Sequence, residues 1–258
     1  MAVESFIRDR LKGRPLLLMA HAVVGYPSLD ANWEMLGRMQ KAGVDLVELQ
    51  MPFSEPIADG PTFIQANQSA LAAGLHWNDY FSLLARARRE FDFGLLFMGY
   101  YNNVFRMGHA AFCERLASAG AIGFIVADLP PEEATDLIGH ARDRQLDFIR
   151  LMAPTNSPAR LKQIADHASG FVYCVARKGV TGRATNLDDS IAAYVRRCRA
   201  VTSLPIALGF GIRSAEHVAR LKGVADIAIV GSACLESWER DGSAGYAHFL
   251  ESLVAATR

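Results

Sequence analysis

The sequence has few cysteines, and they lie far apart. The four cysteines of this 258-residue chain form no CxxC pair and have no spacing to histidine that is typical of a zinc site: Cys113, Cys174, Cys198 and Cys234. Disulfides are rare where the surroundings are reducing. We therefore expect free thiols in the core of a cytoplasmic protein.

The chain also has no formal net charge, because 27 Lys and Arg residues balance 27 Asp and Glu residues. A neutral chain has no long-range field to attract nucleic acid or an anionic membrane, so neither is an expected partner, and an anionic substrate would need local binding groups. The apolar run Leu16–Val24 contains His21, is too short to span a bilayer and lacks a signal-peptide cleavage pattern. We expect no membrane segment.

Several motifs of known chemistry are absent. The chain contains no HExxH, GxSxG or Walker A motif, and no two histidines have the spacing of metal ligands. The segment Gly209–Ser214 is not a convincing GxGxxG, because Ser214 takes the place of the third glycine and the segment lies late in the chain. We therefore predict neither a metal site nor a nucleotide cofactor.

What the chain does have is a regular alternation of short apolar runs and longer amphipathic stretches. The apolar runs predict strands at 16–23, 46–51, 94–100, 123–126, 148–152, 171–175, 205–208 and 227–230. The stretches between them predict helices at 29–41, 77–90, 110–119, 132–144, 158–168, 190–201, 215–221 and about 244–256. A further helical segment over residues 1–13 precedes the first strand.

Strand–helix units repeated in this way over 258 residues are typical of a (β/α)₈ TIM barrel, an α/β fold. The near-continuous apolar runs suit parallel strands covered by helices. A doubly wound open sheet is the structural alternative. No composition break marks a boundary, so we predict a single TIM-barrel domain over residues 1–258, with the N-terminal helix covering the bottom of the barrel.

The second strand carries a carboxylate, Glu48. Alternation along a strand places Val47 and Leu49 on the outer face that meets the helices, so Glu48 and Gln50 point inward near the C-terminal mouth. A Glu there could exchange protons with a bound ligand, because partial burial tunes its pKa. The alternative is a structural Glu whose oxygens are bonded by its neighbours.

A second carboxylate, Asp59, follows eleven residues later in the segment Ala-Asp-Gly-Pro. Asp-Gly-Pro is typical of a turn, and from the residues alone a simple turn is the stronger interpretation. A catalytic role stays open, because active sites of such barrels are built from the loops that follow the strands.

Three glycine-bearing loops in the last third of the chain predict an anion site. They are Gly179–Gly182, which includes Thr181, then Gly209–Gly211 around Phe210, and Gly231–Ser232. Backbone N–H groups of such loops, together with a helix N-terminus, bind phosphate in many barrels, whereas tight left-handed turns are the alternative. Other candidate pocket residues near strand ends are Tyr100, Asp128 and Tyr173. The alternatives are that Asp128 caps a turn and that the two tyrosines belong to the barrel core.

Taken together, these motifs resemble the tryptophan synthase α subunit family. The matching segments run in order through nearly the whole chain: Val47–Leu49, Pro52–Gln65, Tyr100–Phe105, Val126–Pro130, Met152–Thr155, Gly170–Tyr173, Gly179–Gly182, Gly209–Ile212 and Val230–Ala233. The resemblance implies a barrel lyase of tryptophan biosynthesis that needs no cofactor. It implies retro-aldol cleavage of indole-3-glycerol phosphate to indole and glyceraldehyde 3-phosphate.

The resemblance also implies roles for single residues. Glu48 would be the general acid–base, and Asp59 would accept a hydrogen bond from the indole N–H. The substrate-binding residues would be Tyr100, Asp128, Tyr173, Thr181, Gly182, Phe210, Gly211, Gly231 and Ser232, of which Gly182, Gly211, Gly231 and Ser232 contact the phosphate. The implied partner is a pyridoxal-phosphate-dependent β subunit, which receives the indole.

The chain departs from the family pattern at several positions. The family usually has Gly at Gln50, Asp at Glu55 in the loop that faces the β subunit, and Ser at Ala176, with further changes in Val23–Pro27 and at Arg213. Two alternatives therefore stand beside the main hypothesis. One is a divergent stand-alone lyase for indole-3-glycerol phosphate or a related aryl-glycerol phosphate, and the other is a non-catalytic regulatory subunit.

Overall fold

The computed structural model describes residues 2–175, 189–209 and 211–258. Within these residues, strands β1 to β8 run parallel and close into a barrel in chain order. Closure is made by β1, whose Leu17 lies in register with Ile227 of β8 and whose Met19 also pairs with Leu46 of β2. The predicted TIM barrel is confirmed. The open sheet is excluded because β1 and β8, which would be separate strands of an open sheet, pair with each other.

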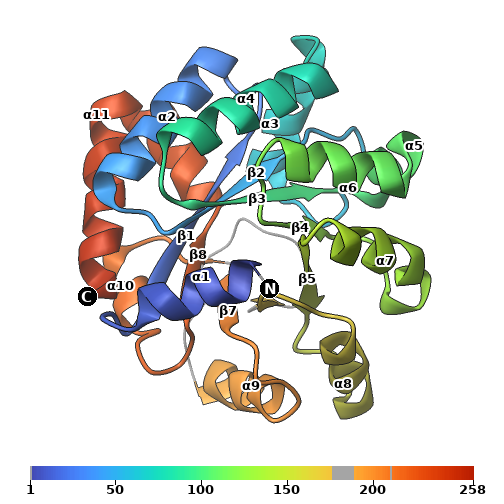
Figure 1. Cartoon of the computed structure of the whole chain (residues 1–258). Coiled ribbons are helices and arrows are strands. Elements are labelled where there is room, and N and C mark those ends of the chain that lie inside the picture. Colours follow the sequence, from blue (N-terminus) through green and yellow to red (C-terminus); the bar gives the residue numbers. More distant parts are fainter. Residues whose placement is uncertain (1, 176–188, 210) are drawn as a thin grey trace.

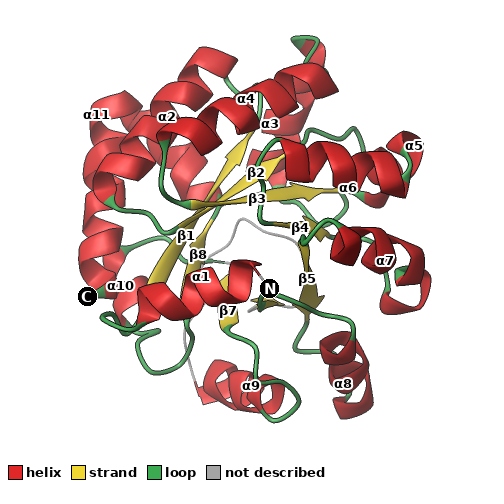
Figure 2. Cartoon of the chain, viewed as in Figure 1, coloured by secondary structure: helices red, strands yellow, loops and turns green. Residues whose placement is uncertain are grey.

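The strands are bounded within one residue of the predicted ends. They are β1 Leu17–Val23, β2 Leu46–Gln50, β3 Gly94–Gly99, β4 Gly123–Val126, β5 Asp147–Met152, β6 Val172–Val175, β7 Ile206–Gly209 and β8 Ile227–Val230. Figure 2 shows them as a central ring of arrows enclosed by helices. Parallel strands buried on both faces need apolar residues throughout, which is why the sequence locates them well.

Helices cover the outside of this ring. They are α1 Ala2–Leu11, α2 Leu29–Ala42, α3 Pro61–Ala72, α4 Trp77–Glu90, α5 Tyr101–Met107, α6 His109–Ser118, the 3₁₀ helix η1 Pro131–Glu133, α7 Thr135–Asp143, α8 Pro158–Asp166, α9 Asp189–Arg199, α10 Ala215–Ala219 and α11 Ser232–Thr257. Most follow the predicted stretches. Two of them (α3 and α5) lie where the sequence pattern predicts loops, and η1 overlaps the start of the predicted helix at 132–144.

The last helix also differs from the prediction, because α11 begins at Ser232 and not near residue 244. Gly242, with φ +63° and ψ −166°, interrupts it and separates two helical halves. The predicted C-terminal helix corresponds to the second half. The first half directly follows β8, and its N-terminus therefore lies at the barrel mouth.

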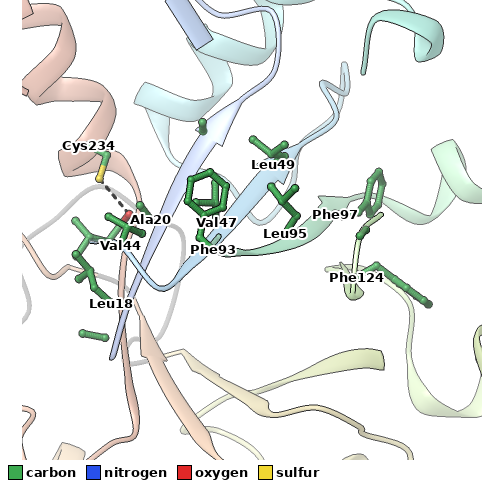
Figure 3. Close-up of a cluster of buried hydrophobic side chains, with 14 of the residues drawn as sticks. Leu18, Ala20, Val44, Val47, Leu49, Phe93, Leu95, Phe97, Phe124 and Cys234 are labelled. Carbon is green, nitrogen blue, oxygen red and sulfur yellow. Dashed lines mark hydrogen bonds between the residues drawn. The ribbon is translucent and has the colours of Figure 1, made fainter. Parts of the chain in front are cut away.

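The hydrophobic core has an outer layer, between strands and helices, and an inner layer inside the barrel. Val47 and Leu49 belong to the outer cluster, whereas Leu46 belongs to the inner one. Figure 3 shows the outer faces of β1, β2 and β3 presenting side chains such as Leu18, Val47 and Leu95. The predicted alternation along β2 is thus confirmed, and it directs Glu48 and Gln50 inward.

The bottom of the barrel is closed by α1, which lies across the near opening in Figure 1. Val3 and Ile7 of this helix are buried in the inner cluster, and the backbone N–H of Val3 donates to Asp147 Oδ2 at 2.8 Å. The predicted N-terminal helix and its place are confirmed. With this end closed, access to the interior is left to the C-terminal mouth.

Two further properties concern the whole described chain. None of its helices combines the length and apolarity that a bilayer crossing requires. The four cysteines are buried and unpaired, as expected from their spacing.

Candidate active site

A pocket opens at the C-terminal ends of the strands, with an empty volume of about 620 Å³, its open mouth included. One part of its lining is polar: His21, Glu48, Asp59, Tyr173 and Ser232. The rest is apolar or backbone: Ala58, Phe63, Met98, Ile125, Ala127, Leu151, Gly211, Ile212, Ile229 and Gly231. A mainly apolar cavity with a few converging polar groups is typical of a small-molecule site.

Glu48 lies in this pocket on β2 and is only 2% exposed. Its Oε1 atom is 3.3 Å from Nδ1 of His21. Its Oε2 atom is buried and has no hydrogen-bond partner among the described residues. A buried polar atom without a partner is costly, so this oxygen is available to a ligand that enters the pocket.

Asp59, 5% exposed, joins Glu48 in the same lining although it comes from the loop after β2. Its Oδ2 atom accepts a hydrogen bond from Gln50 Nε2 at 2.7 Å. Burial raises the pKa of Asp59, and the hydrogen bonds from Gln50 and Tyr100 and the charge of His21 only partly oppose this. Asp59 also ends a tight turn, because its N–H donates to the carbonyl of Pro56 at 2.9 Å. The predicted turn and the buried carboxylate therefore belong to the same residue.

Gln50 connects the two carboxylates through His21. Its side-chain Oε1 lies 2.8 Å from His21 Nε2, while its Nε2 donates to Asp59 and faces Asn67 Oδ1 at 3.4 Å. Asn67 in turn accepts from the backbone N–H of Phe53 at 2.9 Å, which ties the network to the loop after β2. The polar wall is therefore a continuous set of hydrogen-bonded side chains.

His21 is a site residue that the motifs did not indicate. It lies on β1, is 5% exposed, and its ring is 4.5 Å from that of Phe63. Burial of the ring opposes its charged form, but the carboxylates of Glu48 and Asp59 and the bonds to Glu48 and Gln50 outweigh burial and raise its pKa. A signal existed, because alternation along β1 places it on the inward face with Leu17 and Met19.

The other end of the pocket is formed by backbone after β7 and β8. Gly231 caps α11, and Ser232 is the first residue of that helix. Gly211 has φ +81°, which favours glycine, and a Cβ atom at Gly209 would lie 2.8 Å from the Tyr173 hydroxyl. Free N–H groups at a helix start, together with the helix dipole, suit an anion.

The remaining predicted residues have different places. Tyr173 lines the pocket, whereas Tyr100 lies outside the lining, fully buried, and accepts from the N–H of Ala58 at 3.2 Å while bonding Asp59. Asp128 also lies outside the lining and accepts from the N–H of Tyr101, the first residue of α5, at 2.7 Å. Both therefore hold the loops that shape the pocket.

Three predicted residues, Thr181, Gly182 and Phe210, lie outside the described residues. Of the predicted anion loops, the structure thus describes Gly209, Gly211 and Gly231–Ser232. Across the described ranges, no three His, Cys, Asp or Glu side chains are grouped as ligands of one metal ion.

Comparison with known proteins adds a family to this geometry. The family model described as "Tryptophan synthase alpha chain" matches residues 8–254. A tryptophan synthase alpha chain of Syntrophotalea carbinolica is 45% identical, over 97% of this chain and 99% of its own length. One of Desulforapulum autotrophicum is 43% identical, over 98% of this chain and 100% of its own length.

Solved structures agree with the sequence matches. Tryptophan synthase of Mycobacterium tuberculosis superposes with a TM-score of 0.92 at 31% identity, over 99% of this chain and 98% of that one. A chain of the tryptophan synthase complex from Pyrococcus furiosus superposes with a TM-score of 0.83 at 28% identity, over 95% of this chain and 98% of that one.

Proposed function

Because the chain belongs to the tryptophan synthase alpha chain family, we propose that it is a lyase that cleaves indole-3-glycerol phosphate. The products are indole and glyceraldehyde 3-phosphate, formed by a retro-aldol reaction in tryptophan biosynthesis. The observation that carries the proposal is one pocket that combines two buried carboxylates with a backbone anion site at the start of α11.

Glu48 has the geometry of the general acid–base. Cleavage requires a proton on the ring carbon of the scissile bond and removal of a proton from the adjacent side-chain hydroxyl. The Oε2 atom of Glu48 has no partner within the described chain and belongs to a pocket-lining side chain, so one carboxyl group can serve both transfers. The proton given to carbon and the proton taken from oxygen leave Glu48 in its starting state.

Asp59 has the geometry to bind the ring nitrogen. A carboxylate offers about four lone-pair positions, and the bonds from Gln50 and Tyr100 occupy only part of them. An indole N–H donated to Asp59 would bring negative charge close to the ring as it becomes cationic on protonation. Such a fixed charge lowers the barrier because it is in place before the reaction begins.

We assign the phosphate of the substrate to neutral backbone N–H donors at the other end of the pocket. Gly211, Gly231 and Ser232 lie in the described part of the pocket, and the start of α11 adds its dipole. Thr181, Gly182 and Phe210 remain predictions for the same substrate. No cofactor is assigned to this chain.

A partner surface is also proposed, for a pyridoxal-phosphate-dependent β subunit that receives the indole. Ile57, in the loop after β2, is 72% exposed, and Phe105, in α5 after β3, is 64% exposed. Both follow strands whose C-terminal ends form the pocket mouth, and large apolar side chains exposed near a site mark contact surfaces. The Pyrococcus relative is described as part of a tryptophan synthase complex.

This surface can be tested by binding. Phe105→Ala should weaken the affinity for a β subunit about tenfold, which corresponds to about 1.4 kcal/mol, and leave indole release by the isolated chain unchanged. Leu71→Ala, at a residue 36% exposed in α3, is the matched control. Equal affinities of the two variants would argue against this surface.

We also infer a reducing compartment, the cytoplasm. All four cysteines are unpaired and buried, although a secreted chain of this kind would be expected to use disulfides. Labelling of the four thiols only after unfolding, in protein isolated under alkylating conditions, would support the inference.

The activity itself is tested with purified protein and indole-3-glycerol phosphate. We expect equal amounts of indole and glyceraldehyde 3-phosphate, with or without a β subunit. A panel of related aryl-glycerol phosphates tests the divergent lyase, because a faster reaction with another ring would contradict the assigned substrate. A partner activated equally by the double variant Glu48→Ala, Asp59→Ala would instead indicate a regulatory subunit.

A further inference from the structure

Two residues of the polar wall have no assigned role, His21 and Gln50. They join the carboxylates in one line of contacts: Glu48 to His21, His21 to Gln50, and Gln50 to Asp59. His21 is 5% exposed, Gln50 is fully buried, and His21 itself lines the pocket. The line is therefore inside the site and shielded from bulk water.

The donors and acceptors along this line can be assigned one after another. Asp59 can only accept while ionised, so the Gln50 atom 2.7 Å from it must be the amide nitrogen. The amide oxygen then faces His21 Nε2 at 2.8 Å and must accept, which places a proton on Nε2. The amide orientation and the first ring proton follow from the ionised Asp59.

The contact between Glu48 and His21 then needs one more proton. Nδ1 of a neutral ring protonated at Nε2 is an acceptor, and it would face a carboxylate oxygen at 3.3 Å with no hydrogen between them. A single proton resolves this conflict in either of two forms. The pair is imidazolium with carboxylate, or neutral imidazole with carboxylic acid.

We propose that His21 is a positioning residue that shares one proton with Glu48 and holds its carboxyl group so that Oε2 remains available to the substrate. The proposal rests on the assigned lyase reaction and deepens it. In the imidazolium form, Oε2 of Glu48 is the base that takes the hydroxyl proton, and the protonated Oε2 is the acid that gives a proton to the ring carbon. The shared proton stays between Nδ1 and Oε1 throughout, so Glu48 can change roles without exchange with solvent.

The surroundings of His21 support the imidazolium form. The charged groups that face it among the described residues are Glu48 from β2 and Asp59 from the following loop. Phe63 from α3 lies against the ring, and Tyr173 from β6 lines the same pocket. The Cys234 thiol from α11 lies by the backbone of His21, and burial raises its pKa to about 12, so it adds no charge.

The direct test is nitrogen NMR of histidine-labelled protein without substrate. We expect both ring nitrogens of His21 to stay protonated to a pH above the ordinary histidine value of about 6.5. In Glu48→Gln the midpoint should fall, because the shared proton loses its charged partner. His248, exposed on α11, provides the control: His248→Asn assigns its signal, which Glu48→Gln should leave in place.

A midpoint of His21 that is ordinary or lower in the wild type, or that Glu48→Gln does not move, would overturn the proposal. This measurement needs no turnover. If His21 has the expected raised midpoint but the protein releases no indole, only the lyase assignment is contradicted. If the protein releases indole but the midpoint of His21 is ordinary, only the shared proton is contradicted.

The kinetic test uses His21→Gln, which keeps a hydrogen-bonding side chain but cannot titrate. We expect kcat to fall about 10- to 100-fold, less than the roughly 10²- to 10⁴-fold effect of a general acid–base because His21 acts through Glu48. The pH profile should lose the limb that follows His21. His21→Asn provides a second variant if the first folds poorly. A loss by the same factor at every pH would show a merely structural role.

Discussion

Both ends of this barrel bury carboxylates, but they use them differently. At the bottom, Asp45 is fully buried, and its Oδ1 accepts from Arg10 at 3.2 Å and from Arg14 at 2.7 Å, while its Oδ2 accepts from the N–H of Leu18 at 2.9 Å. At the mouth, Glu48 is almost as buried, yet its Oε2 has no partner in the described chain.

The difference shows that burial of a charge does not by itself identify a functional site. Asp45 balances its desolvation with two guanidinium groups and a backbone donor, so nothing remains for a ligand. In Glu48, the desolvation of Oε2 is not offset by any hydrogen bond within the described chain. A substrate group that enters the pocket can supply the missing bond. Glu48 is distinguished from Asp45 by an unsatisfied carboxylate oxygen on a side chain that lines the pocket.

The largest expected effect comes from Glu48→Gln at the mouth. It should lower kcat for indole release about 10³-fold, because general acid–base catalysis contributes about 10² to 10⁴. The free energy of unfolding should fall much less than the activation free energy rises, because Oε2 has no partner to lose and His21 can give up its proton once its charged partner is gone. Steady-state kinetics measures kcat, and urea denaturation of the same preparation measures the free energy of unfolding. A loss of unfolding free energy as large as the rise in activation free energy would show that Glu48 is a structural residue like Asp45.

The next effect comes from Asp45→Asn at the bottom. We expect a loss of about 2–3 kcal/mol in the free energy of unfolding, because an amide cannot satisfy two guanidinium groups and a backbone N–H together. Since Asp45 lies at the opposite end of the barrel, kcat should remain at the wild-type value. Urea denaturation measures the loss, and a catalytic defect in the folded variant would contradict the division between the two ends.

The smallest expected effect concerns how the stability of the protein depends on pH. Burial raises the pKa of Asp59, so the folded state holds this proton more tightly than the unfolded chain does. Asp59 therefore favours folding at low pH, and this contribution is lost as the pH rises through its folded pKa. Asp59→Asn should gain stability relative to wild type as pH rises, which denaturation at a series of pH values measures.

Most of the fold follows from local sequence patterns, because parallel strands buried on both faces must be apolar throughout. The patterns miss α3 and α5 for separate reasons. The segment that forms α3 begins with Gly60 and Pro61, residues typical of turns, although Pro is also favoured in the first turn of a helix. Helix α5 has only seven residues, too few for a clear period.

The site is less predictable, because it depends on contacts between distant segments. Alternation alone places Glu48 inward, and it also places His21 inward on the neighbouring strand. No local pattern tells whether a loop carboxylate such as Asp59 turns to solvent or into the barrel. That choice is made by Gln50 and Tyr100, which bond its carboxyl group from two different strand ends.

The pairing of β1 with β8 also has a consequence for synthesis of the chain. A ribosome completes residues 17–20 more than two hundred positions before their partners at 227–230. Arg14 is likewise synthesised long before Thr257, whose hydroxyl accepts a hydrogen bond from Nη2 of Arg14 at 2.9 Å. The first strand therefore leaves the ribosome with an unpaired edge, the kind of edge that promotes aggregation. Pairing with β2 covers only the other edge of β1, so the edge that faces β8 stays without its partner until the last strand is made.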